Sequence, residues 1–160
     1  MTDTVSRKAE AAPPQATTTL WNLSVICLLS WIVPGAGHIL LRRPRRALAF
    51  FVAVLVLFFG GLALGSKLYQ YEAQQPLSLF AMFAQVGAGL PYFIARFIAS
   101  YAKLHAGSAF YSFAEGFQFG NGYIERVTFE YGNTFTIVAG LLNFLIILDA
   151  YDIAVGRKKG

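Results

Sequence analysis

Residues 31–51 read WIVPGAGHILLRRPRRALAFF, and this stretch decides the fold because it separates two apolar runs. It places a Pro-Gly break, one histidine and four arginines between them. Proline disrupts a helix by removing a backbone donor, and arginine is costly in the hydrocarbon layer of a membrane. The stretch therefore predicts a tight hairpin between two membrane helices. The first helix either crosses with a kink near Pro34 or dips and returns.

The composition of the whole chain supports residence in a membrane. Of its 160 residues, 56% are hydrophobic and only 13% are charged, and the mean hydropathy is +0.54. Such values are unusual for a soluble domain. A buried bundle in a soluble protein would need polar faces at helical spacing, and residues 47–65 have none. We therefore expect an all-α fold, a polytopic integral membrane protein of about four transmembrane helices with a Pro-Gly break in the first.

The apolar runs predict where these helices lie, since about 20 helical residues cross about 30 Å of hydrocarbon. The predicted helices cover residues 20–41, 47–65, 77–99 and 134–155. Together they make a single helical membrane domain at 20–156, flanked by a disordered tail at 1–19 and a basic tail at 157–160. The aromatic connection at 101–133 is expected to lie along the membrane surface, and Asn133 or Thr134 to cap the last helix.

The net charge of +5 is concentrated in two clusters beside apolar runs. They contain Arg42, Arg43, Arg45 and Arg46, and then Arg157, Lys158 and Lys159. Two explanations of the first cluster are equally good. Its arginines hold the hairpin turn in the cytoplasm, or they contact anionic lipid headgroups. Four crossings would then place the basic tail on the opposite side, against the same rule. The conflict disappears if the third run, which contains Pro91 and is followed by Arg96, is re-entrant.

Asp149 and Asp152 are the sharpest chemical feature, because they lie three residues apart on one face of the last predicted helix. If the two aspartates lie at membrane depth, they suggest a function, because an ionisable group is costly there. If instead the helix end emerges into water, the aspartates only face the basic tail. A proton or cation path would add Asn143 and His38, yet Asn143 projects about 180° from Asp152. His38 is expected to cap carbonyls freed by the break rather than to bind a metal, which needs several ligands.

Other patterns weigh against catalysis. The single cysteine, Cys27, excludes an internal disulfide and a cysteine metal cluster. Dinucleotide, phosphate-loop, serine-elbow and zinc spacings are missing from the sequence. The order Asp149-x-x-Asp152 is similar to the start of the CDP-alcohol phosphatidyltransferase motif, but Ile153 stands where that motif has glycine. We expect no enzyme activity, no cofactor and no metal.

Two stretches resemble known families. PGAGH followed by LLRRPRRALAFF resembles the hairpin of the two-transmembrane-helix domain family. LPYFIAR at 90–96 and EYGNTFTIVAGLLNFLIILDAYDIAVGRK near the end are similar to a family of small bacterial inner-membrane proteins of unknown function that also carry the PGAGH hairpin. The second resemblance implies an all-helical protein of the bacterial cytoplasmic membrane and brings no assigned activity.

Three functions stay open on this evidence. The leading hypothesis is a small membrane scaffold or assembly partner, which would bind the lipid bilayer, anionic lipid, and a membrane protein or a second copy of itself. The alternative is a transporter or channel subunit that uses Asp149 and Asp152 within the membrane. A lipid-modifying enzyme is the third hypothesis. It is the least favoured one, because the paired aspartates lack the rest of a catalytic motif. Nucleic acid is not an expected partner, since both basic clusters lie beside apolar runs.

Overall fold

The computed structural model describes residues 20–71, 74–105, 107, 111 and 122–158. The predicted tail at 1–19, much of the aromatic connection and residues 159–160 lie outside the described residues. Each of the elements in the described part is a helix, which confirms the all-α expectation. They are α1 (Leu20–Ile32), α2 (Ala36–Leu40), α3 (Pro44–Ala63), α4 (Pro76–Val86), α5 (Leu90–Leu104) and α7 (Phe129–Ala154).

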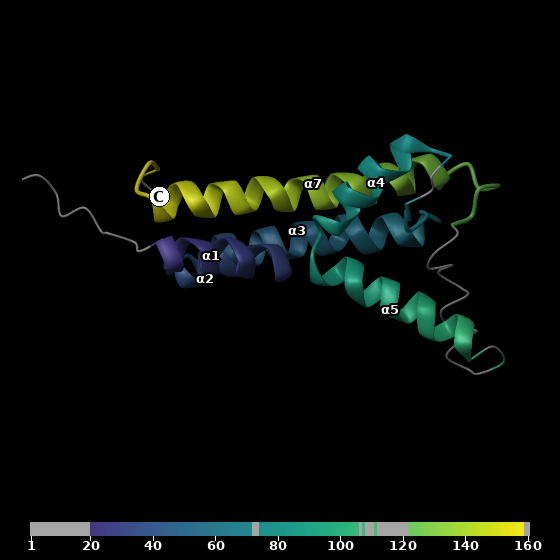
Figure 1. Ribbon diagram of the computed structural model, residues 1–160, viewed down its shortest axis with the longest axis horizontal. Helices are drawn as coiled ribbons and strands as arrows, with labels where there is room; N and C mark the ends of the chain where they lie inside the picture. The colour runs from purple at the N-terminus through teal and green to yellow at the C-terminus, as the bar shows by residue number, and fades with distance from the viewer. Residues whose placement is uncertain (1–19, 72–73, 106, 108–110, 112–121, 159–160) are drawn as a thin grey trace, which may run out of the picture.

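The long helices α3 and α7 lie side by side and run in opposite directions (Figure 1). They contain 20 and 26 residues, and both are long and apolar enough to cross a membrane. Pro44 occupies the first turn of α3, where its missing N–H would have had no helical partner. Val54 and Phe58 of α3 pack with Ile146 of α7 in the core that joins the pair.

Glycine allows α3 and α7 to approach closely at one end of their contact. A Cβ atom on Gly61 would lie only 2.7 Å from the carbonyl oxygen of Gly132. The adjacent Gly60 has open space where its Cβ would be, so its identity is not required by packing. The two backbones therefore meet at Gly61 because neither residue of the contact carries a side chain.

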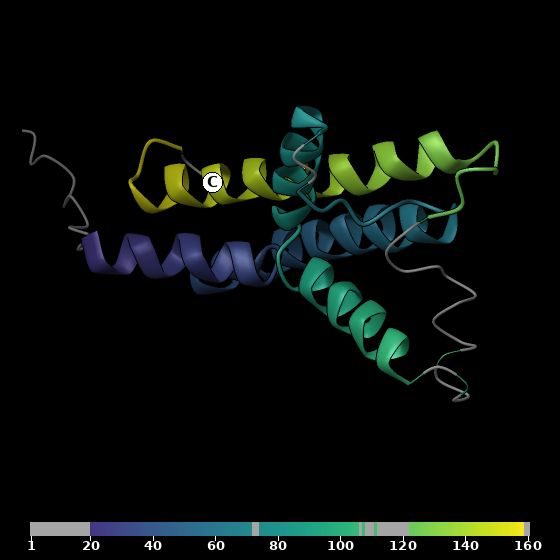
Figure 2. The same cartoon turned by 45° about the vertical axis from the view of Figure 1, so that its right-hand side comes forward.

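The first apolar run forms a short hairpin instead of one crossing helix. α1 ends at Ile32, Gly35 adopts a φ of 80°, and α2 follows directly. The N–H of Gly37 donates to Oγ of Ser30 at 3.1 Å, which ties α2 to α1. Both views show α1 starting at the end of the molecule where α7 finishes and stopping near the middle of α7 (Figures 1 and 2). The chain therefore reverses at the Pro-Gly break, and α2 folds back against α1.

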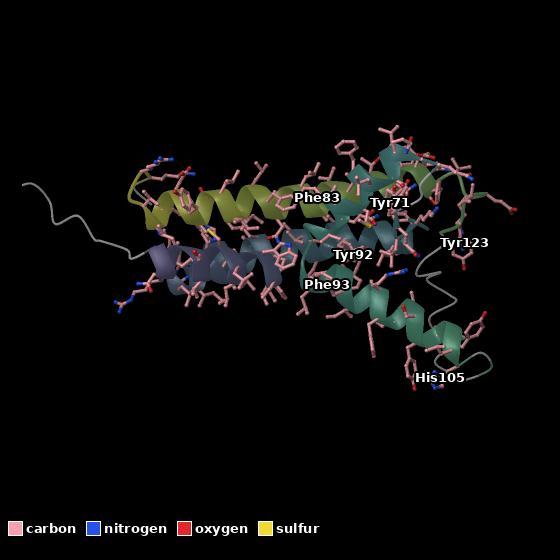
Figure 3. The ribbon with its side chains drawn as sticks, viewed as in Figure 1. Tyr71, Phe83, Tyr92, Phe93, His105 and Tyr123 are labelled. Carbon is pink, nitrogen blue, oxygen red and sulfur yellow. The ribbon has the colours of Figure 1, made fainter. Side chains whose placement is uncertain are left out.

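The third apolar run forms a second short hairpin. α4 and α5 meet at a 115° bend, where Gly89 has a φ of 70°. α4 crosses α7 steeply near the middle of the helix pair, as Figure 2 shows, and α5 runs from there toward the end where α3 stops (Figures 1 and 2). Phe83 of α4 stacks on Phe144 of α7, with ring centroids 5.3 Å apart (Figure 3). The α1–α2 hairpin thus lies along one half of the helix pair, and α5 extends toward its other end.

Two helices of the described part are long and apolar enough to cross a membrane, or three if α4 and α5 count as one bent span. Four crossings are therefore not confirmed. The predicted helices 20–41 and 77–99 are each divided by a break, because glycine and proline interrupt them. The last helix begins at Phe129 and not at 134, so the expected cap at Asn133 or Thr134 is wrong: Thr128 precedes the helix, and Asn133 is buried within it.

Candidate functional site

Three clusters of polar groups lie along α7, and the first is at its carboxyl end. We call His38, Asp149 and Lys158 the basic-end cluster. Nε2 of His38 lies 3.0 Å from Oδ2 of Asp149, and Nζ of Lys158 donates to the other oxygen of that carboxylate. The His38 side chain is fully buried, whereas that of Asp149 is 18% exposed. One carboxylate thereby joins α2, α7 and the basic tail.

A tight turn after α7 brings the tail back to this carboxylate. Gly156 adopts a φ of 80°, and its N–H donates to the carbonyl of Ile153. The next N–H, that of Arg157, donates to the carbonyl of Asp152 at 2.9 Å. These two bonds form the Schellman arrangement that ends many helices, which favours glycine at the left-handed position. The turn reverses the chain so that Lys158 reaches Asp149 nine residues earlier.

A pocket of about 490 Å³ adjoins the basic-end cluster between α3 and α7. Its charged wall consists of Arg46 from the first turn of α3, Asp149 and Lys158. Its apolar wall consists of Phe50, Leu142, Leu145 and Ile146. The pocket therefore combines two cations and one anion with an apolar surface at one end of the helix pair.

The second cluster, the hairpin junction, lies near the middle of α7 and consists of Trp31, Val86, Gly87 and Asn143. Nδ2 of Asn143 donates to the carbonyl oxygens of Trp31 at 3.3 Å and of Gly87 at 2.9 Å. The indole N–H of Trp31 donates to the carbonyl of Val86 at 3.2 Å. Carbonyls at the end of a helix lack donors within the helix, and the interior of a membrane supplies no water. Asn143 therefore satisfies one carbonyl from each hairpin.

The two hairpin tips touch at this junction. A Cβ atom on Gly89 would lie 1.9 Å from the carbonyl oxygen of Trp31, so only glycine fits there. A Cβ atom on Gly140 would lie 1.7 Å from the carbonyl oxygen of Ala84, which places the backbone of α4 directly against that of α7. The junction is thus a contact of three backbones, held by one asparagine and one tryptophan.

The third cluster, the far-end network, consists of Ser66, Gln85, Asn133 and Thr136. Oγ of Ser66 donates to Oδ1 of Asn133 at 3.2 Å, and Nε2 of Gln85 donates to Oγ1 of Thr136 at 2.9 Å. Gln85 also binds the backbone of the loop after α3, where it accepts from the N–H of Tyr69 and donates to the carbonyl of Lys67. Burial, followed by the charge of Glu130, raises the pKa of the Tyr69 phenol in this loop. The network fixes α4 and the loop to the start of α7.

The structure brings together two of the predicted polar residues, His38 and Asp149. His38 does not cap carbonyls of the break, and that expectation is wrong, because its imidazole binds the carboxylate while Asn143 caps Trp31. Asn143 and Asp149 bind different segments, so they do not form one path. Asp152 is more exposed and faces Arg157 at 3.8 Å.

Of the four arginines in the hairpin turn, one contributes to a described pocket, namely Arg46. Arg42 has a φ of 57° in the turn after α2, and Arg43 immediately precedes α3. Arg45 is exposed next to Arg46 and does not line that pocket. The four arginines therefore differ in their surroundings. Arg46 and Arg45 form a matched pair for testing the role of the cluster, because only Arg46 lines the pocket.

Sequence reasoning missed the half-buried Trp31 and the buried Gln85 as hydrogen-bonding residues, because an indole and an amide in apolar runs have no recognisable spacing. One signal could have revealed the junction. Gly-Ala-Gly occurs at 35–37 and again at 87–89, in each case directly after a short apolar helix or its break. This repeat marks the tips of the two hairpins, where glycine is required by positive φ or by close contact.

Among the described residues, no three His, Cys, Asp or Glu side chains lie close enough together to hold a metal ion. Cys27 is half-buried in α1. Three buried polar atoms, Nδ1 of His38, Nδ2 of Asn133 and Oδ1 of Asn143, have no hydrogen-bond partner within the described part of the chain. The polar clusters bind chain segments to one another, and the pocket beside Arg46 is one of the features with room for a ligand; a second pocket, of about 300 Å³ and with an apolar lining, lies beside Pro34 and Pro44.

Within the residues that the structure describes, the protein is all-helical and has two or three helices suited to spanning a membrane. The chain belongs to a family of unknown function, DUF6677, whose model matches residues 25–159. The match begins within α1 and includes both hairpins, α3 and α7. No curated protein and no solved structure matches the chain. The expected relation to an uncharacterised family is thereby confirmed.

Proposed function

We propose that this chain is a small integral membrane protein of the bacterial cytoplasmic membrane, and that it works as a scaffold or assembly partner without enzyme activity. In this proposal α3 and α7 cross the membrane, while the hairpins α1–α2 and α4–α5 each enter to about half its depth. The arginines of the first turn face the cytoplasm, in line with the preference of basic loops for that side. Since α3 and α7 are antiparallel, the basic tail then faces the cytoplasm too.

The proposed arrangement would remove the topological conflict in the sequence. Arg46 and Lys158 line the same pocket, so the two basic clusters share one end of the helix pair. The segment between α3 and α7 therefore contributes an even number of crossings, which a re-entrant α4–α5 hairpin satisfies. Tyr71 and Tyr123 lie at the other end, where aromatic side chains suit the opposite membrane interface (Figure 3).

One observation carries the assembly role: the polar groups at membrane depth each bind another segment of the same chain. Asn143 holds both hairpin tips, and Asp149 holds α2 and the tail. Outward-facing positions of both spans are apolar instead, as at Val52 and Val56 of α3 and Leu148 of α7. An interior whose polar side chains bind the chain's own segments, together with apolar outer faces, suits contact with other membrane proteins.

Photo-crosslinking within intact membranes tests this role. A benzophenone amino acid at Val56, which is 65% exposed, should give one discrete protein adduct if α3 presents a partner surface. The matched position is Leu148 on α7, which is 58% exposed. A discrete adduct from at least one face supports assembly. Adducts with lipid alone from both positions would contradict it.

The opposed hairpins favour a transporter or channel subunit as the second candidate. Broken helices whose ends meet at the membrane midplane are common in transporters, where helix ends and unwound backbone bind substrates or ions. Flux measured in proteoliposomes separates this candidate from the first. Ion or solute flux that is lost in an Asp149→Asn, Asp152→Asn double variant would support transport, and flux indistinguishable from empty liposomes would exclude it. A lipid-modifying enzyme is the least supported role, because both aspartates face the basic tail.

A further inference from the structure

The lining of the pocket beside Arg46 changes from charged to apolar along the helix axis. Asp149 and Lys158 lie at the end of the helix pair, and Arg46 belongs to the first turn of α3. Ile146 and Leu142 lie about one and two turns deeper than Asp149 along α7, and Phe50 lies about one turn deeper than Arg46 along α3. With α3 and α7 crossing the membrane, as proposed above and on which this inference rests, the charged wall lies at the depth of lipid headgroups and the apolar wall at the depth of acyl chains.

The geometry points to a binding site for an anionic phospholipid in this pocket, with the headgroup phosphate beside Arg46 and Lys158. An arginine guanidinium pairs well with phosphate oxygens, and an ammonium has three hydrogens to donate. Lys158 uses one donor on Asp149, which leaves donors for a phosphate. The pocket volume of about 490 Å³ holds a phosphodiester and the first carbons of a chain.

The apolar wall explains why the ligand is a lipid and not a free phosphate. Leu145 lines the pocket and is also 62% exposed, so the pocket surface continues onto the outer face of α7. An acyl chain can follow this surface while its headgroup stays at the charged end. The Asp149 carboxylate holds Lys158 in place and, beside two cations, leaves an excess of positive charge.

Native mass spectrometry of the full chain in detergent tests the site. The probes are dioleoyl phosphatidylglycerol, dioleoyl phosphatidylcholine and glycerol 3-phosphate. The test variant is Arg46→Gln with Lys158→Gln. The matched control is Arg45→Gln with Arg157→Gln, which removes the same charge from adjacent exposed residues that do not line the pocket.

We expect the unaltered chain and the control to retain phosphatidylglycerol over phosphatidylcholine by on the order of tenfold, and the test variant to lose most of that preference. Equal loss in both double variants would overturn the proposal, since the preference would then come from diffuse surface charge. Glycerol 3-phosphate binding as tightly as phosphatidylglycerol would also overturn it. If the test variant unfolds, Arg46→Gln against Arg45→Gln gives the same comparison, because both arginines are exposed.

Discussion

Nε2 of His38 lies 3.0 Å from Oδ2 of Asp149, although 111 positions separate the two residues in the chain. The contact joins the Pro-Gly hairpin to the last helix and buries the imidazole completely. Phe50 lies edge-on to that imidazole, with ring centroids 5.0 Å apart. The carboxylate of Asp149 is therefore the anchor of the hairpin, and Asp152, one turn later, is not.

Replacement of Asp149 by alanine should lower stability more than the same change at Asp152. Asp149→Ala leaves a buried imidazole N–H without an acceptor, which costs about 1–3 kcal/mol. Asp152→Ala removes an exposed ion pair with a 3.8 Å separation, and such pairs are worth about 0–1 kcal/mol. Thermal unfolding of both variants in the same detergent measures the difference. Equal midpoints would show that the His38 contact does not hold the hairpin.

Replacement of Asn143 by leucine should destabilise the junction of the two hairpins. Leucine is close in volume but has no donor, so two carbonyls at the middle of α7 lose their partner. Each buried unsatisfied group costs about 1–3 kcal/mol. Asn22→Leu, an identical exchange at an exposed position of α1, is the control. Unfolding titrations with SDS should separate the two variants, and coincident curves would count against the junction.

Alanine at three glycines should give graded effects. Gly140→Ala places a Cβ atom 1.7 Å from the carbonyl oxygen of Ala84, and Gly61→Ala places one 2.7 Å from that of Gly132. Overpacking of this kind costs about 1–3 kcal/mol. Gly60→Ala meets nothing within 4 Å and should gain about 0.5–1 kcal/mol from better helix propensity. The ranking from SDS titrations should be Gly60→Ala most stable and Gly140→Ala least, and a reversed order would contradict the packing of α4 on α7.

The helical class, the break at Pro34 and the weakness of the third run could all be predicted from the sequence. Composition predicts apolar helices, and proline with glycine marks where a helix stops. Local patterns cannot say whether a broken helix crosses or returns, because that depends on which groups satisfy the freed carbonyls. Here Asn143, more than 100 positions away from Trp31, supplies the donor.

The candidate site was predictable only in part for a similar reason. His38 and Asp149 stand out as polar residues in apolar runs, but their pairing depends on α3 and α7 lying antiparallel. Lys158 reaches the same carboxylate only because Gly156 turns the chain back. The two Gly-Ala-Gly motifs, at 35–37 and 87–89, indicate where both hairpin tips lie, since the same small-residue motif follows each short helix.

In the proposed topology the two basic clusters face one side of the membrane, one half-depth hairpin precedes α3, and the other lies between α3 and α7. Cysteine labelling in sealed vesicles of both orientations measures this most directly, in a Cys27→Ala chain with single cysteines replacing Arg45, Arg157 or Glu125. All three positions are exposed. We expect an impermeant maleimide to label positions 45 and 157 from the same side and position 125 from the other. Labelling of 45 and 157 from opposite sides would contradict it.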